Sequence, residues 1–203
     1  MINSILAGGA ISLGGLVFLN YSGTDKFIAS FLFSIGLICV LLFNLNLFTG
    51  KLAFKHNLKK PTHLLEVYIG NIIGCGIMSL ITTHKIKLIS NDLVLAKLEK
   101  PIMNLIGDGI ICEICIIIAV LGWGMFKTEI TRCLIVILGV VVFILTGAEH
   151  IIADMFYIFT AITVNINLLK DPRIYIFIIF VTLGNILGAV ILHLLIKFRK
   201  ALT

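Results

Sequence analysis

Long apolar stretches alternate with short polar ones along the whole chain. Six apolar segments can be drawn, and each is near the roughly 20 residues that cross a bilayer as a helix. They cover residues 5–19, 27–47, 64–83, 102–126, 133–159 and 174–196. This pattern predicts an all-α, integral, multi-pass membrane protein with six transmembrane helices.

Composition supports this prediction and leaves no room for a soluble domain. The chain of 203 residues is 60% hydrophobic and only 13% charged, with a mean hydropathy of +1.15. Soluble domains are about half apolar and about a quarter charged. Residues 1–21 lack the positive n-region and the cleavage site of a signal peptide, so none is predicted.

The basic charge of the chain bears on its partners and its orientation. In so apolar a chain, the net charge of +6 indicates membrane lipid with anionic headgroups and no nucleic-acid partner. With both termini in the cytoplasm, the inside loops hold more of the 16 Lys and Arg residues than the outside loops. This bias favours two cytoplasmic termini.

The fifth apolar segment contains a polar stretch, GAEHIIADMF, at residues 147–156. Its ionisable residues, Glu149, His150 and Asp154, fall where hydropathy places the inside of the membrane. Charges at that depth cost several kcal/mol and by default indicate function. Gly147 favours a break in the helix, which is tolerated only around a cavity or inside protein. We interpret this stretch as the centre of a permeation path; the alternative is a buried polar clamp between helices.

Two short motifs recur in the two halves of the chain. The motif around Asn71, GNIIG at 70–74, returns around Asn185 as GNILG at 184–188. In the second segment, NLFTG at 46–50 occupies the place that Glu149 and His150 hold in the fifth. Three helices followed by three give two halves of opposite orientation, so the echo predicts a 3+3 inverted repeat with the site at the repeat interface. The repeats cover about 1–88 and 102–199 of one transmembrane channel domain, 1–203.

The sequence gives little indication of a disulfide, a metal site, a cofactor site or an enzyme active site. The five cysteines lie in apolar runs and are expected to pack as small side chains, including the C-x-x-C pair Cys112 and Cys115. A metal site would need further ligands nearby, and none is expected. We also expect no cofactor and no enzyme activity, since a nucleophile pair is lacking. A bundle without a pore would leave the paired mid-membrane motifs unexplained.

Five stretches of the sequence occur in an order that marks a known family. They are LFTG at 47–50, GNIIG at 70–74, GIICEIC at 109–115, EHIIADMF at 149–156 and GNILGA at 184–189. Together they resemble the formate/nitrite transporter family, which includes formate, nitrite and hydrosulfide channels. The resemblance implies a homopentamer in the cell (inner) membrane. Each protomer would have six helices around its own pore, with an aquaporin-like outline and with helices two and five broken.

The resemblance also implies roles for individual residues. On the cytoplasmic side, Leu47, Phe48 and Thr49 would form a mobile loop after the first half of helix two. Together with Leu37 they would make the cytoplasmic constriction.

Further roles implied by the resemblance fall at the centre and on the periplasmic side. Phe33 and Phe143 would line the apolar centre, and His150 would be the central pore histidine. Ile116 would help to close the periplasmic side, and Lys97 stands where the family has a vestibule lysine.

The sequence departs from the family pattern at three polar positions. Glu113 and Asp154 each stand where the family usually has Asn, and Asn46 stands where it often has a glutamate. The two added acids leave the substrate open. One hypothesis is a channel for small monovalent anions or their conjugate acids; the alternative is a channel for a neutral or cationic solute such as ammonium.

The chemistry of the pore can be argued from the residues. An anion that enters an apolar tunnel pays a large desolvation cost, which it avoids by crossing as the neutral acid. Lys97 would attract the anion at the mouth, and His150, with an ordinary pKa near 6.5, could lend a proton or a hydrogen bond. Glu149 is expected to accept the backbone N–H groups that the break leaves free.

Glu113 has two interpretations. As a proton-coupled gate it would oppose anions when ionised and donate a hydrogen bond, as Asn does, when protonated. Alternatively it forms an ion pair with Lys97 or a neighbouring basic group and only shapes the vestibule. Asp108, on the same helix, is expected at the solvated end. Formate, nitrite and hydrosulfide are not distinguished, because one site chemistry serves all three.

Overall fold

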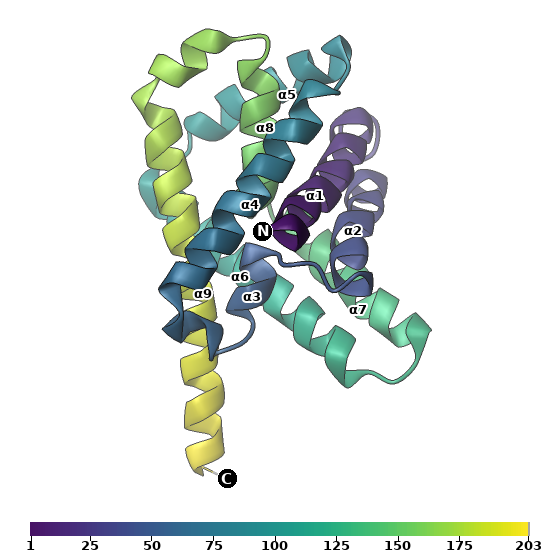
Figure 1. Ribbon diagram of the computed structural model, residues 1–203, viewed down its shortest axis with the longest axis vertical. Coiled ribbons are helices and arrows are strands. Elements are labelled where there is room, and N and C mark those ends of the chain that lie inside the picture. The colour runs from purple at the N-terminus through teal and green to yellow at the C-terminus, as the bar shows by residue number, and fades with distance from the viewer. Residues whose placement is uncertain (203) are drawn as a thin grey trace.

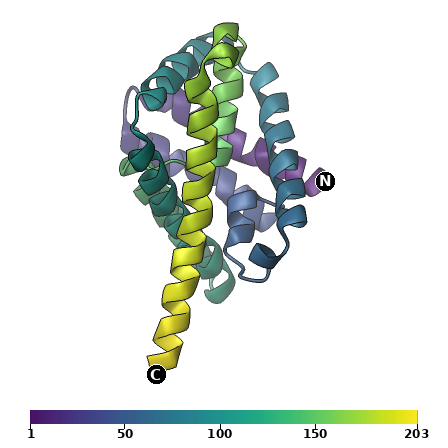
Figure 2. The same cartoon turned by 90° about the vertical axis from the view of Figure 1, so that its left-hand side faces the viewer.

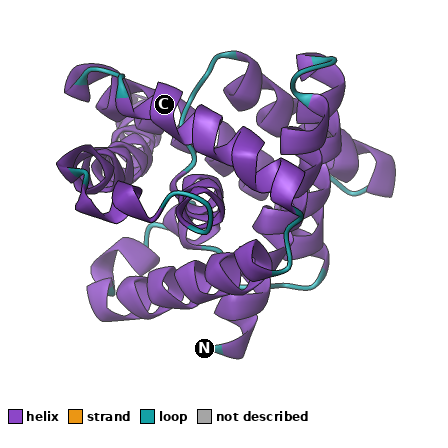
Figure 3. Cartoon of the chain, turned by 90° about the horizontal axis from the view of Figure 1, so that it is seen from above, coloured by secondary structure: helices purple, strands orange, loops and turns teal. Residues whose placement is uncertain are grey.

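The computed structural model describes residues 1–202, with side chains up to residue 199, and the elements there are all helical (Figures 1 and 3). The α-helices are α1 (Ile2–Tyr21), α2 (Lys26–Leu42), α3 (Phe48–Leu52), α4 (Pro61–Leu80), α5 (His84–Leu98), α6 (Ile102–Met125), α7 (Glu129–Leu145), α8 (Ile151–Ile162) and α9 (Pro172–Leu202). Two short 3₁₀ helices, Asn57–Lys59 and Ile166–Lys170, lie in connections. The prediction of an all-α protein is confirmed.

Four of these helices, α1, α4, α6 and α9, are long and apolar enough to cross a membrane. The helices α2 and α8 are apolar but shorter. The apolar segment 27–47 carries α2, after which the chain leaves the helical conformation until α3 begins at Phe48. The segment 133–159 likewise carries α7 and α8, separated by residues 146–150. We name residues 43–47 the first junction and residues 146–150 the second junction.

Helix α5 is an element that the six apolar segments do not include. Its buried residues recur every fourth position, at Ile86, Ser90, Val94 and Leu98, so one narrow stripe faces the protein. This stripe packs against α8, where the Ser90 hydroxyl donates to the Tyr157 carbonyl over 2.8 Å. The connection between α4 and α6 is therefore a structured part of the bundle.

Helix pairs α1–α4 and α6–α9 approach each other closely because glycine removes the side chain at the contact. A Cβ on Gly74 of α4 would lie 2.1 Å from the Ile5 carbonyl oxygen of α1. A Cβ on Gly188 of α9 would lie 2.7 Å from the Ile110 carbonyl oxygen of α6. Small residues allow such approaches between membrane helices, where backbones must come near to gain packing energy.

Helix α8 lies inside the bundle, behind α4 in Figure 1, and only Phe159 and Ile162 of its residues are partly exposed. A helix that is apolar all round is a buried helix. Seen from above, the other helices surround one helix viewed nearly end on (Figure 3). Asp154 of α8 is thus a carboxyl group in the middle of the protein, and it needs a partner there.

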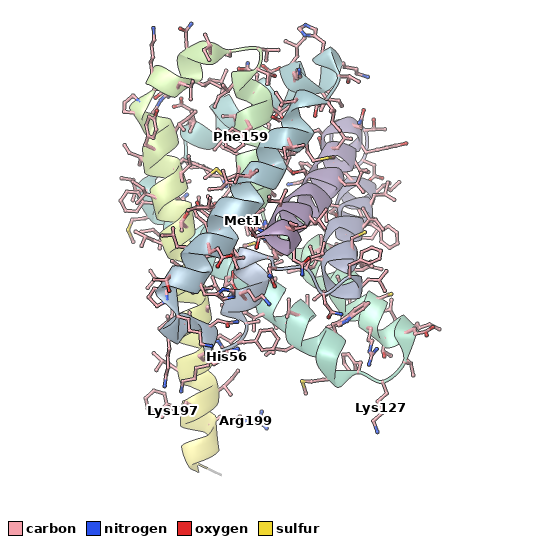
Figure 4. The ribbon with its side chains drawn as sticks, viewed as in Figure 1. Met1, His56, Lys127, Phe159, Lys197 and Arg199 are labelled. Atoms are coloured by element: carbon pink, nitrogen blue, oxygen red, sulfur yellow. The ribbon has the colours of Figure 1, made fainter. Side chains whose placement is uncertain are left out.

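The two ends of the molecule differ. Helix α9 continues beyond the other helices at the end that holds the C-terminus (Figure 2). His56, Lys127 and Lys197 lie toward this end, whereas Phe159 lies toward the opposite end (Figure 4). Met1 lies about halfway between them (Figure 4), where its amino group is 3.3 Å from Glu66 Oε1.

Candidate functional site

The first junction is held by the amide of Asn71, a fully buried residue of α4. Its Oδ1 accepts the Phe48 N–H over 2.8 Å, at the start of α3. Its Nδ2 donates to the Asn46 carbonyl over 2.8 Å and to the Ser4 carbonyl over 2.7 Å. A helix end leaves backbone groups without partners, and an amide is suited to them because it both donates and accepts.

The second junction repeats this arrangement with Asn185 of α9, also fully buried. Its Oδ1 accepts the Ile151 N–H over 3.2 Å, at the start of α8. Its Nδ2 donates to the Glu149 carbonyl over 3.1 Å and to the Gly109 carbonyl over 2.8 Å. In both junctions the amide joins the first N–H of a helix to the carbonyl two residues earlier. It also reaches α1 in one case and α6 in the other.

Gly147 gives the second junction its turn. Its φ of +76° lies in the left-handed region, which glycine adopts without the steric cost that a Cβ brings. The first junction has Asn44 at a φ of 51°, and Asn is the kind of residue that tolerates this region when glycine is absent.

The second junction also carries a group of charged side chains that we name the ionic cluster: Lys97, Lys100, Asp108, Glu149 and Asp154. Lys97 pairs with Glu149 Oε2 and lies 2.9 Å from Asp154 Oδ1. Lys100 lies 2.8 Å from Glu149 Oε1 and 2.6 Å from Asp108 Oδ2. The Glu149 side chain is only 1% exposed, so these pairs are shielded from water.

Lys100 also fixes the backbone of the junction, because its ammonium donates to the Gly147 carbonyl over 2.9 Å. Burial works against its charge, but the neighbouring Glu149 and Asp108 carboxylates together outweigh this effect and raise the pKa of Lys100 above its ordinary value. Lys100 therefore ties the end of α7 to the connection between α5 and α6 as a cation.

The expectation that the Glu149 side chain accepts free backbone N–H groups is wrong. Both of its oxygens are taken by lysines, and the Ile151 N–H goes to Asn185. The Ala153 N–H goes to His150 Nδ1 over 3.2 Å. The Asn185 amide and the His150 imidazole thus accept the backbone N–H groups that were assigned to Glu149. The Glu149 carboxylate instead binds two lysine ammonium groups.

His150 and Thr49 join the two junctions. His150 Nε2 lies 2.9 Å from Thr49 Oγ1, so a hydrogen bond connects the start of α8 to α3. Because Nδ1 accepts the Ala153 N–H, the ring proton is assigned to Nε2, which donates to the Thr49 hydroxyl. Both side chains are buried, at 2% and 0% exposure.

The surroundings of His150 are apolar and aromatic. The Phe143 ring stacks on the imidazole at a centroid distance of 5.9 Å, and Phe33 meets Phe143 edge-on at 6.0 Å. Leu37, Leu47 and Phe48 are likewise buried, at 1%, 1% and 4% exposure. An ion that reaches this region loses its water without gaining a polar wall in return.

Two cavities open on different parts of this region. The first, of about 250 Å³, is bounded by His150, Phe33 and Phe143 and by three lysines, so we name it the lysine-lined cavity. The second, of about 290 Å³, is bounded by Leu47 and Trp123 among others, and we name it the Trp123 cavity. Its lining also includes Lys51.

The structure brings together most of the residues singled out from the sequence. His150, Phe33, Phe143, Lys97, Glu149 and Asp154 line the first cavity, and Leu47 lines the second. Asn46, Asn71 and Asn185 meet at the junctions. Leu37, Phe48, Thr49 and Ile116 are buried and line neither cavity.

Glu113 stands apart from this group. It is fully buried on α6, and neither carboxylate oxygen has a hydrogen-bonding partner among the described side chains and backbone. The ion pair with Lys97 that one interpretation required is not formed, because Lys97 pairs with Glu149 and Asp154. Glu113 instead packs against α9, where its Cβ lies 2.9 Å from the position of a Cβ on Gly188.

Sequence reasoning missed two members of the ionic cluster. Lys100 was not singled out, and Asp108 was expected at a solvated end, whereas its side chain is only 22% exposed and is paired with Lys100. Lys100 lies close in sequence to Lys97, and Asp108 lies in the first part of the apolar segment 102–126, so the closeness of these charges was the available signal.

The sequence matches the formate/nitrite transporter family over residues 1–199. The chain belongs to this family. The resemblance drawn from the five motifs is therefore confirmed, and the chain is an integral membrane protein of a family of channels and transporters, which are not enzymes. Among curated proteins the comparison finds no match.

Two solved structures share the fold of this chain. One is described as a pentameric formate channel with formate bound; it is 22% identical, with a TM-score of 0.81 over 100% of this chain and 96% of that one. The other is described as an FNT family ion channel; it is 21% identical, with a TM-score of 0.85 over 98% of this chain and 88% of that one. At these identities the likeness establishes the fold.

Proposed function

We propose that this member of the formate/nitrite transporter family is a channel for small monovalent anions that cross as their conjugate acids, of the formate, nitrite or hydrosulfide type. The observation that carries the proposal is the hydrogen bond between Thr49 and His150. It is a polar contact between side chains in an apolar, aromatic region. His150 contributes to one cavity, and Leu47, two residues before Thr49 in sequence, contributes to the other.

The proposed architecture is six transmembrane helices in one domain, 1–203. In it, α2 with α3 and α7 with α8 are two membrane-spanning helices interrupted at the junctions. The matching bonds of Asn71 and Asn185 support a 3+3 inverted repeat over about 1–88 and 102–199, because each amide serves the same backbone groups. The close pairs α1–α4 and α6–α9 support the same relation.

The proposed assembly is a homopentamer in the inner membrane, as the description of one structural relative suggests for that protein. Both termini are placed in the cytoplasm on the Lys and Arg bias of the loops. Native mass spectrometry in mild detergent tests the assembly, and a monomer, dimer or trimer there would count against it.

The path proposed for the substrate begins in the lysine-lined cavity and ends in the Trp123 cavity. Between them the apolar side chains make a bare anion costly, whereas a neutral acid loses far less on leaving water. The His150 Nε2–H is placed to donate to the substrate in exchange for Thr49. Leu37, Leu47 and Phe48 then form the constriction, on the side of α3 and the Trp123 cavity.

Glu113 is proposed as a proton-coupled gate. Its support is that a fully buried carboxyl group without a partner is costly as an anion. Because it lies between α6 and α9, it would act on the packing of these helices. Glu113→Gln keeps the shape in a permanently neutral form, so it should raise anion flux at neutral pH and leave flux in acid little changed. Loss of flux under both conditions would end this interpretation.

The alternative of an ammonium channel gains no support. It rested on added negative charge at Glu113 and Asp154, but Asp154 is paired with Lys97 and Glu113 lines neither cavity. The family and the structural relatives also favour anions.

Flux into proteoliposomes that contain a pH-sensitive dye tests the proposal. Formate, nitrite, hydrosulfide and ammonium are added in turn to vesicles with and without the protein. We expect the protein to speed internal acidification by at least one of the three anions, more so at lower pH, and to leave ammonium flux unchanged. Anion flux equal to that of empty vesicles would refute the channel, and faster ammonium flux alone would establish the alternative.

A further inference from the structure

Three lysines line the cavity beside His150: Lys26, Lys97 and Lys100. Two of them belong to the ionic cluster. There two ammonium groups are paired with three carboxyl groups, on Asp108, Glu149 and Asp154. Opposite charges at these distances largely cancel each other's field at longer range. The cluster therefore offers little net positive charge to an anion that approaches from solution.

Lys26 differs from the other two lysines. It is exposed at the start of α2, and no ion pair or hydrogen bond holds its ammonium within the part of the chain whose side chains are described. Asp25 beside it accepts the Ile28 N–H over 3.0 Å and does not line the cavity. Lys26 is thus the lining lysine whose charge is left uncompensated by a bonded carboxylate.

Helix α2 runs from the exposed Lys26 toward the apolar region around His150. Phe33, which also lines the cavity, is seven residues further along α2 and so on the same helical face. Seven residues of helix correspond to a rise of about 10 Å. A cation on this face is therefore about two turns of α2 before the aromatic residues next to His150.

We propose that Lys26 is the anion-recruiting residue of the lysine-lined cavity, while Lys97 and Lys100 hold the second junction. The inference rests on the proposed anion channel and reassigns the attraction expected of Lys97. An exposed ammonium at a cavity rim raises the local concentration of small monovalent anions without binding them tightly. This attraction acts through solvent, so salt screens it, whereas the buried pairs of the cluster are screened much less.

The test compares Lys26→Gln with Lys85→Gln. Lys85 is also exposed and lines neither cavity, so both variants lose one positive charge and only one loses it at the rim. Nitrite flux into proteoliposomes is measured against nitrite concentration at low and high ionic strength. At about 10 mM salt, Lys26→Gln should raise the half-saturating nitrite concentration by about two- to fivefold and leave the maximal flux unchanged.

The controls separate recruitment from structure. Near 1 M salt, where the Debye length is about 3 Å, the difference from the unmodified protein should vanish. Lys26→Arg should behave as the unmodified protein, and Lys85→Gln should change little at either salt concentration.

Two results would overturn the inference. Equal effects of Lys26→Gln and Lys85→Gln at low salt would remove any special role of the rim position. A loss of maximal flux that persists at high salt would show a structural role instead. If the unmodified protein carries formate, nitrite and hydrosulfide no faster than empty vesicles do, the proposed function itself fails and the inference falls with it.

Discussion

The two junctions use the same amide clamp in very different electrostatic surroundings. At the first junction, Asn71 binds neutral backbone groups, and the neighbouring contacts are those of Phe48 and Thr49 with Tyr68 and His150. At the second, Asn185 makes the same bonds, and the ionic cluster encloses them. The common part is what the start of a helix requires, namely partners for its free backbone groups.

The difference suggests different tasks for the two junctions. Lys100 and Glu149 bind the second junction to the elements around it, and moving it would separate buried charges. The first junction can change by exchanging neutral hydrogen bonds. We therefore expect movement at Leu47 to Thr49 against a fixed His150, which fits the mobile loop that the family resemblance implies.

The largest effect is expected from removing either clamp. Asn185→Leu leaves the Ile151 N–H and the Glu149 carbonyl at the second junction without this partner, and Asn71→Leu does the same to the Phe48 N–H and the Asn46 carbonyl at the first junction. With about 1–3 kcal/mol for each buried unpaired group, each variant should lose about 5 kcal/mol of folding free energy. Thermal unfolding in detergent measures this, with the exposed Asn20→Leu as control. A benign Asn71→Leu would show that the two junctions are not equivalent.

A smaller loss, specific to the second junction, is expected from Lys97→Gln. It leaves Asp154 without its cation and Glu149 with Lys100 alone, at a cost of about 3 kcal/mol. The matched control is Lys51→Gln beside the first junction, which should stay within about 0.5 kcal/mol of the unmodified protein.

Chemical unfolding of the double variant Lys97→Gln/Asp154→Asn completes this test. Because the second change removes the orphaned carboxylate, it should restore part of the loss. Equal costs for Lys51→Gln and Lys97→Gln would erase the electrostatic contrast between the junctions.

The bond that joins the junctions is tested by His150→Asn and Thr49→Val. His150→Asn keeps a polar group but cannot titrate, so flux should persist with a flatter pH dependence. Thr49→Val removes the same hydrogen bond and keeps the imidazole, so flux should fall while its pH dependence remains. The readout is proteoliposome acidification over a pH series. Identical pH profiles for the two variants would remove the imidazole from the mechanism.

The smallest effect concerns the turns. Gly147→Ala forces a Cβ into a left-handed conformation where nothing crowds it, so the cost is the backbone strain alone, about 1 kcal/mol. At the corresponding position of the first junction, Asn44→Gly introduces a residue that adopts the left-handed conformation without strain. This change should alter the free energy of unfolding by less than about 0.5 kcal/mol. Calorimetric unfolding of the two variants resolves the difference; a stabilising Gly147→Ala would show that the turn is not strained.

Much of the fold follows from the sequence, because membrane-spanning helices correspond to long apolar stretches. The predicted segments at 64–83 and 102–126 overlap α4 and α6 closely. Helix α5 was not predicted, since Lys85, Lys87, Asn91 and Asp92 interrupt its apolar residues and no long apolar run marks it. Its existence depends on α8, which no local pattern reveals.

The sequence predicted most residues of the candidate site but fewer of the contacts between them. The pairing of repeats placed Asn71 with Asn185, and the structure gives them matching bonds. The partners of Glu149 and Lys97 were misassigned because these ion pairs join residues about 50 positions apart, which a charge pattern cannot match. Because Glu149 lies next to Gly147 and Ala148 in sequence, its carboxylate was assigned to the free backbone N–H groups of the second junction. Two lysine ammonium groups bind a carboxylate more strongly than backbone amide N–H groups do.

Trp123, the single tryptophan of the chain, lines only one of the two cavities. If the proposed constriction lies between the two cavities, indole emission from this protein comes from one side of it alone. On the proposed path, a weak acid that quenches indole emission, added on the side of the lysine-lined cavity, would quench Trp123 only after passing Leu47. Trp123 is thus an intrinsic fluorescence probe for the arrival of a quencher in the Trp123 cavity. No label is needed, and the lysine-lined cavity contributes no tryptophan signal.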